Sequence, residues 1–92
     1  MQTSARHLEF HGRVQGVGFR HFIMHTALDL RITGWVRNRA DGRVEAVVCG
    51  TPDAVHTMLE RVRHGPAYAA VTKFEVTDVH ETFERFEMRP TE

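Results

Sequence analysis

Residues 7–30 read HLEFHGRVQGVGFRHFIMHTALDL, and most of what can be predicted about the fold starts from this stretch. Its first part alternates apolar and polar side chains, with Leu8 and Phe10 on one face, which predicts a half-buried strand over residues 7–14. Its last part repeats apolar residues at helical spacing, which predicts a helix over residues 20–30. The glycines between the two patterns predict a tight turn from strand to helix.

The rest of the chain continues with strand and helix signals. Asp41-Gly42 is a strong hairpin signal between two apolar stretches. Thr51-Pro52 predicts the N-cap and first residue of a second helix, and Gly65-Pro66 predicts its end. The predicted elements are strands at residues 7–14, 33–38, 44–49, 71–79 and 83–88, and helices at 20–30 and from 52 to the Gly65-Pro66 pair.

This order of elements predicts an α+β fold. A β-α-β-β-α-β order followed by a last strand indicates a ferredoxin-like sandwich, an antiparallel sheet of four to five strands with two helices on one face. The length of 92 residues fits one compact domain. We expect residues 1–5 to form a flexible N-terminal tail and residues 6–92 to form that domain. The fold class alone does not identify an activity, because this architecture hosts many functions.

The composition narrows the class of protein. Twelve Lys and Arg balance twelve Asp and Glu, which argues against a nucleic-acid or membrane-surface partner. The balance conceals an excess of arginine in residues 12–43, and arginine suits carboxylate or phosphate. Cys49 is the only cysteine, which excludes an internal disulfide and favours a cytoplasmic location. Residues 1–6 lack the apolar middle of a signal peptide, and no apolar run approaches the roughly 20 residues of a membrane span.

The glycine-punctuated loop is the first candidate functional segment. Gly16 and Gly18 would let backbone N–H groups converge on an anion, and the following helix would present its positive end to the same place. Arg20 stands at that end and could bind two phosphate oxygens. The alternative is that the glycines only permit the turn and that Arg20 is solvated.

Asn38 is the second candidate, at the end of a predicted strand and just before the hairpin. Asparagine at such a place is usually a turn former, and its functional alternative is an amide that holds a water molecule. Trp35 in the same strand is interpreted as a large packing residue. Cys49 is interpreted as a small buried hydrophobe and not as a nucleophile.

The seven histidines do not complete a metal-ligand pattern. His21 and His25 share a predicted helix face without a third ligand, and His7 and His11 share a strand face. We therefore expect no metal and no cofactor. A site without an evident metal, nucleophile or general base suits hydrolysis of a bond that is already reactive, since positioning and charge stabilisation can carry phosphoryl transfer.

Two segments resemble the signatures of the acylphosphatase family. They are Gly12-Arg13-Val14-Gln15-Gly16-Val17-Gly18-Phe19-Arg20 and Gly34-Trp35-Val36-Arg37-Asn38, and the resemblance extends over about residues 6–89. It implies a metal-independent hydrolase that splits the carboxyl–phosphate bond of small acyl phosphates into a carboxylate and inorganic phosphate. It also implies that Arg20 binds the phosphate and that Asn38 orients the attacking water, the substrate phosphate accepting the water's proton. The phosphate-binding loop that the resemblance implies is formed by the backbone amides of Gln15, Gly16, Val17, Gly18, Phe19 and Arg20.

The chain departs from the family pattern at Arg31, where the family commonly has glycine before the Gly34-Trp35 pair. If the backbone of Arg31 is left-handed, a side chain there costs on the order of 1 kcal/mol. This departure concerns local stability at the end of the first helix and leaves Arg20 and Asn38 unaffected.

The expected protein is a cytoplasmic monomer whose partners are an acyl phosphate and inorganic phosphate. One alternative is a non-catalytic, anion-binding module related to the N-terminal domain of the carbamoyltransferases that mature hydrogenases. Those proteins continue with further segments, whereas this sequence stops at Glu92. A weaker alternative is an RNA-binding domain, which would need exposed aromatic residues and a basic sheet face.

Overall fold

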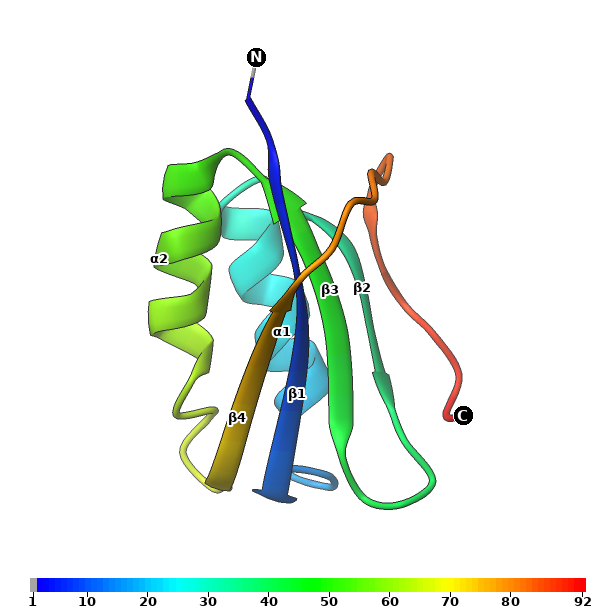
Figure 1. The fold of residues 1–92 in the computed structure, drawn as a ribbon. Helices are drawn as coiled ribbons and strands as arrows, with labels where there is room; N and C mark the ends of the chain where they lie inside the picture. Colours follow the sequence, from blue (N-terminus) through cyan, green and yellow to red (C-terminus); the bar gives the residue numbers. More distant parts are fainter. Residues whose placement is uncertain (1) are drawn as a thin grey trace.

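The computed structural model describes residues 2–92, which form one five-stranded sheet with both helices packed against the same face (Figure 1). The strand order is β4-β1-β3-β2-β5, which confirms the predicted ferredoxin-like sandwich. Within residues 2–92, neither helix has the length and apolar character needed to cross a membrane. The elements are β1 (Ser4–Arg13), α1 (Phe19–Asp29), β2 (Thr33–Asn38), β3 (Val44–Gly50), α2 (Pro52–Val62), β4 (Ala70–Asp78) and β5 (Phe86–Met88).

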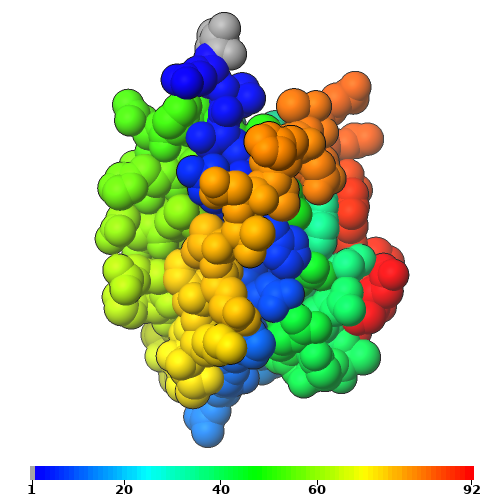
Figure 2. All heavy atoms as spheres, viewed as in Figure 1, coloured from blue at the N-terminus to red at the C-terminus, as the bar shows by residue number. Residues whose placement is uncertain are grey.

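The prediction of a purely antiparallel sheet is wrong at one edge, because β5 pairs parallel to β2. After β4, residues 79–85 pass over the face of the sheet opposite the helices and reach the far edge (Figures 1 and 2). Since this crossing stays at the end of the sheet where β4 finishes, β5 runs opposite to β4 and therefore in the direction of β2. The strand predicted at residues 83–88 is correspondingly short, and only Phe86–Met88 pairs.

The sheet also begins earlier than predicted. Ser4 and Ala5, which we expected in a flexible tail, lie in β1 and pair with Gly50 and Cys49 of β3. Ala5 is buried, and its carbonyl accepts a hydrogen bond from the N–H group of Val79. Ser4 and Ala5 show no alternating apolar pattern that would predict a strand. They join β1 because β3 continues to Gly50 and offers them pairing partners. Met1, the first residue of the predicted tail, lies outside the described residues.

The core fixes the start of α1. Phe10 of β1 lies between two other aromatic rings, with ring centroids 4.7 Å from Phe19 and 4.9 Å from Phe74. Because Phe19 is buried in this cluster, the residue that follows it, Arg20, is held at a defined place. The core also contains Leu8, Val14, Ile23, Ala27, Val36, Val48, Val55, Met58 and Val62.

The second helix begins as the sequence predicts. Thr51 is its N-cap, and the Thr51 hydroxyl accepts a hydrogen bond of 3.2 Å from the N–H group of Ala54. Pro52 occupies the first turn, where its missing N–H group leaves no hydrogen bond unmade. The cap and proline place α2 so that Val55, Met58 and Val62 reach the core.

The end of α1 places Arg31 in the left-handed region, with φ of 56°. The N–H group of Arg31 donates to the carbonyl of Leu28, and that of Ile32 donates to the carbonyl of Ala27. These two hydrogen bonds form the Schellman motif that ends many helices, in which this position is usually glycine. The left-handed backbone anticipated at Arg31 is therefore present, with an arginine where a side chain is unfavourable.

Replacing Arg31 with glycine is expected to stabilise the protein by about 1 kcal/mol, because glycine has no Cβ to clash in this conformation. For a domain of this size the change corresponds to a rise in Tm of roughly 4–8 °C. Thermal unfolding followed by circular dichroism measures it. Arg31→Ala is the matched control, since it removes the guanidinium and keeps the Cβ, and its Tm should stay near that of the wild type. An equal rise in both variants would attribute the effect to the charge instead.

Candidate active site

A cavity of about 140 Å³ lies at the end of the sheet where β1 leads into α1 and where β2 turns into β3. The loop after β1 and the β2–β3 hairpin lie at this same end (Figure 1). Asn38, the last residue of β2, therefore meets a loop that is distant in sequence. The lining residues are Val14, Gln15, Gly16, Gly18, Phe19, Arg20, His21 and Asn38.

The glycines give the loop a conformation that other residues adopt at a penalty. Gly16 has φ of 72° and Gly18 has φ of 78°, both in the left-handed region. Gly18 is the N-cap of α1, and the first hydrogen bond of the helix joins the N–H group of Phe22 to the carbonyl of Gly18 at 3.0 Å. The N–H groups that precede Phe22 in this turn have no partner within the helix, so they are open to an anion.

Gln15 has a role that its place in the signature segment did not predict. Its side-chain amide donates hydrogen bonds to the carbonyls of Arg39 at 2.8 Å and Arg43 at 2.9 Å. These bonds fasten the glycine loop to the hairpin that follows Asn38. The side-chain amide of Gln15 therefore holds the loop against the hairpin. The backbone N–H group of Gln15 is the part that can contribute to the predicted phosphate-binding loop.

Arg20 differs from the arginines around the hairpin in having no acidic partner. Among residues 2–92, no carboxylate lies within 4.0 Å of its guanidinium, so its fork of donors is open to a ligand. The hairpin arginines are all paired: Arg37 Nε with Glu45 Oε1 at 2.8 Å, Arg39 Nη1 with the same oxygen at 3.3 Å, and Arg43 Nη1 with Glu9 Oε1 at 2.9 Å.

Glu45 is the acidic centre of this part of the molecule. Its other oxygen, Oε2, lies 2.6 Å from Nε2 of His7. Partial burial alone would raise the pKa of Glu45, but the hydrogen bonds from His7 and Arg37 outweigh it and lower that pKa. Glu45 is therefore a carboxylate throughout the neutral pH range.

The histidines that approach carboxylates lie on the sheet face opposite the helices and away from the cavity. In two groups of three residues, the potential metal-ligand atoms lie within 4.8 Å of one another. The first group is His7, Glu9 and Glu45, and the second is Glu9, His11 and Glu75. The carboxylates of Glu45 and Glu9 already bind arginines, so these groups form an ion-pair network. Of the two helical histidines singled out in the sequence, both are exposed, and only His21 lines the cavity.

The structure brings together most of the predicted site residues. Gln15, Gly16, Gly18, Phe19 and Arg20 line the cavity with Asn38, whereas Val17 is not among the lining residues and packs partly against the core. His21 was missed as a member of this site, although its place directly after Arg20 in the first turn of a helix is a usable signal. Trp35 is a buried packing residue, as predicted, and the guanidinium groups of Arg37 and Arg89 lie 4.8 Å and 4.6 Å from the centre of its ring.

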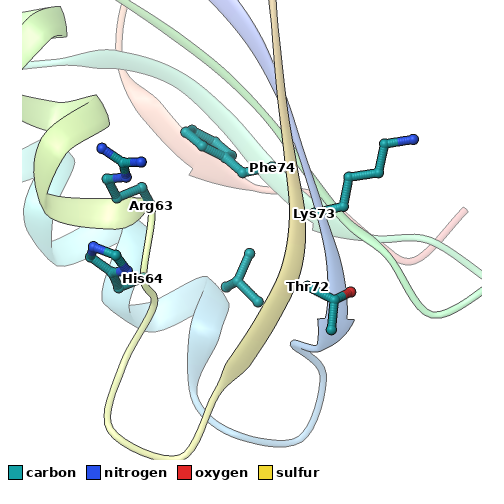
Figure 3. A pocket seen from close by; sticks show the side chains of 6 residues that line it. Arg63, His64, Thr72, Lys73 and Phe74 are labelled. Carbon is teal, nitrogen blue, oxygen red and sulfur yellow. The ribbon is translucent and has the colours of Figure 1, made fainter.

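A larger cavity of about 330 Å³ lies between the end of α2 and β4 (Figure 3). Arg63 and His64 border it from the helix end, and Phe74 borders it from β4, while the side chain of Lys73 points to the other side of the strand. This cavity shares no lining residue with the glycine loop. It lacks the open helix turn and the asparagine, so we place the candidate site in the smaller cavity.

Comparisons with known proteins identify the family to which the chain belongs. The acylphosphatase family model matches residues 6–88. An acylphosphatase of Rhodopseudomonas palustris is 43% identical over 99% of both chains. The structure of an acylphosphatase from Coxiella burnetii superposes with a TM-score of 0.89 at 35% identity, over 95% of this chain and 93% of that one. Full-length HypF in its phosphate- and nucleotide-bound form contains a region that matches 98% of this chain with a TM-score of 0.90 at 25% identity, although it amounts to 12% of HypF. The chain belongs to the acylphosphatase family of hydrolases.

Proposed function

We propose that this protein hydrolyses the carboxyl–phosphate bond of small acyl phosphates, with Arg20 binding the phosphate and Asn38 orienting the attacking water. The observation that supports this best is that one small cavity is lined by an open helix turn, by Asn38 and by Arg20, which has no acidic partner among residues 2–92. An acyl phosphate carries the charge that such a cavity attracts, and its bond is reactive enough to need little more than positioning.

Arg20 and the loop amides have complementary tasks in this proposal. The backbone N–H groups from Gln15 to Arg20 surround the phosphoryl group, and the positive end of α1 adds to their field. The Arg20 guanidinium binds two phosphoryl oxygens and stabilises the charge that develops on them in the transition state. Because Phe19 is buried in the core, the backbone that carries Arg20 is held in place before the substrate arrives.

Asn38 supplies the second half of the reaction. Its amide can donate to and accept from one water molecule, which places the water in line with the bond to be broken. The water oxygen forms the new bond to phosphorus, and the phosphorus–oxygen bond to the carboxyl group breaks. The electron pair leaves on the carboxylate, and the water's proton passes to a phosphoryl oxygen, so no separate base is required.

The similarity to part of HypF is the ground for the alternative function. A non-catalytic module that only binds an acyl phosphate or another anion would use the same loop and arginine. The two proposals differ at Asn38, since a binding module has no need for a water-orienting amide. Turnover of substrate by the isolated chain separates them.

We further propose that the protein acts as a monomer in the cytoplasm and uses no metal. All proposed site residues come from one chain, namely from the β1–α1 loop, the first turn of α1 and the end of β2. The single cysteine, Cys49, is buried and free, which is the state expected in a reducing compartment.

The proposed activity can be tested with a panel of acyl phosphates. We expect the purified chain to hydrolyse acetyl, benzoyl and carbamoyl phosphate in the presence of EDTA, and to leave phosphate monoesters intact. Phosphate release and loss of the acyl phosphate are both measured. Binding of inorganic phosphate without turnover of any acyl phosphate would support the anion-binding module instead, and a requirement for added divalent metal would contradict the metal-free mechanism.

A further inference from the structure

We propose that Glu45 is a positioning residue for Asn38. This inference rests on the proposed function, in which Asn38 orients the attacking water. Glu45 belongs to β3 and does not line the cavity. Its effect on the reaction would therefore pass through the backbone and side chains around Asn38.

Glu45 binds both sequence neighbours of Asn38. One carboxylate oxygen accepts hydrogen bonds from Arg37 at 2.8 Å and from Arg39 at 3.3 Å. The strand register supports this contact, because Arg37 pairs directly with Glu45 and Asn38 pairs with Val44. A residue whose two neighbours share one anchor has little freedom to rotate about its own backbone.

The anchor itself is held firmly. The side chain of Glu45 is 12% exposed, and its second oxygen is 2.6 Å from His7 Nε2. On the other side, the Arg37 guanidinium lies 4.8 Å from the centre of the Trp35 ring. The Arg37 guanidinium contacts both a carboxylate and an aromatic ring, so its side chain is already restricted. Holding the adjacent Asn38 in position therefore costs little additional conformational entropy.

Glu45 is also connected, through Arg39, to the glycine loop on the other side of the cavity. Arg39 is fastened at its side chain by Glu45 and at its carbonyl by Gln15. The N–H group of Arg39 also donates to the carbonyl of Arg43 and closes the hairpin. Glu45 thus stabilises the hairpin directly opposite the loop that would carry the phosphate, and a displacement of about 1 Å there is enough to lower a rate greatly.

A double-mutant cycle tests this inference. Glu45→Ala is expected to lower kcat about tenfold, Glu45→Gln less, and neither should change inhibition by inorganic phosphate more than about twofold. In an Asn38→Ala background, Glu45→Ala should have almost no further effect, because the residue it positions is gone. Glu75→Gln is the matched control, since Glu75 lies on the same sheet face and pairs with His11 at 2.9 Å, outside the hairpin. It should keep the wild-type kcat.

Two kinetic outcomes would overturn the inference. An equal fold-loss of kcat on Glu45→Ala in both backgrounds would show that Glu45 does not act through Asn38. Tighter inhibition by phosphate in Glu45→Ala would show that the carboxylate acts by restraining the charge of Arg37 and Arg39.

A spectroscopic readout separates this inference from the proposed activity. Asn38 is the only asparagine, and Gln2 and Gln15 are the only glutamines, so the side-chain amide signals in a nitrogen–proton correlation spectrum can be assigned readily. Glu45→Ala should shift the Asn38 amide pair, and Glu75→Gln should leave it in place. An unchanged Asn38 signal in Glu45→Ala overturns the positioning role whatever the activity. Absence of hydrolysis by the wild type, with that signal shifted in Glu45→Ala, contradicts only the proposed function.

Discussion

Replacing Arg20 with alanine is expected to abolish the hydrolysis of acyl phosphates, with kcat/KM falling by about 10³-fold or more. Among residues 2–92, Arg20 is the only arginine that lines the cavity, so no second guanidinium there takes its place. Arg20→Lys should be nearly as inactive, because lysine keeps the charge and loses the planar fork that binds two oxygens. Steady-state kinetics with benzoyl phosphate measures both losses.

The control for Arg20 is Arg63→Ala. Arg63 is exposed and borders the larger cavity between α2 and β4, so its loss should leave kcat/KM near the wild-type value. Circular dichroism establishes that each variant is folded. Substantial turnover by a folded Arg20→Ala protein would exclude Arg20 from the site. A large loss of kcat/KM in Arg63→Ala would indicate that the phosphate binds in the larger cavity, between α2 and β4.

Asn38→Ala is expected to lower kcat on the order of 10²-fold while inorganic phosphate still binds with nearly wild-type affinity. The reason is that the amide acts on the water, whereas the phosphate is bound by Arg20 and the loop. Asn38→Asp should also be slow, because a carboxylate lacks the N–H donors and repels the anionic substrate. Kinetics gives kcat, and competitive inhibition by phosphate gives the affinity.

Thr33→Ala is a suitable control for Asn38. Thr33 stands at the opposite end of β2, where its hydroxyl donates to the carbonyl of Cys49 at 3.3 Å, so its loss tests for a general effect of disturbing the strand. Its kcat should be unchanged. If Asn38→Ala weakened phosphate binding as strongly as it lowered kcat, Asn38 would be a phosphate ligand and not a water-orienting residue.

Local signals were sufficient for most of the fold. Alternation over β1, the Asp41-Gly42 turn and the Thr51-Pro52 start of α2 depend on near neighbours in the chain, and the structure contains all three features. The direction of β5 could not be predicted in this way. It depends on where residues 79–85 cross the sheet, and the ends of that segment are held by hydrogen bonds to residues far away in the sequence, Val79 to Ala5 and Arg85 to Gly34.

Some features of the candidate site could also be recognised in the sequence, whereas others depend on the fold. Arg20, Asn38 and the glycine loop are recognisable because glycines precede a predicted helix, Asn38 ends a predicted strand, and both segments resemble the family signatures. The contacts of the Gln15 side chain with the hairpin and of Glu45 with Arg37 and Arg39 have no local signature. They join separate elements, and they exist only because the sheet places those elements side by side.

The sequence by itself therefore determined the order of elements through periodicity and turn chemistry. The resemblance of two short segments indicated the family and proposed Arg20 and Asn38 for the site. The tertiary structure alone decided which arginines are free. Arg20 and the hairpin arginines are equivalent in composition, and folding pairs Arg37, Arg39 and Arg43 with carboxylates while Arg20 stays open to a ligand. The physical reason is that ion pairs act over a few ångströms in space, and only the sheet register brings Glu45 and Glu9 within that range.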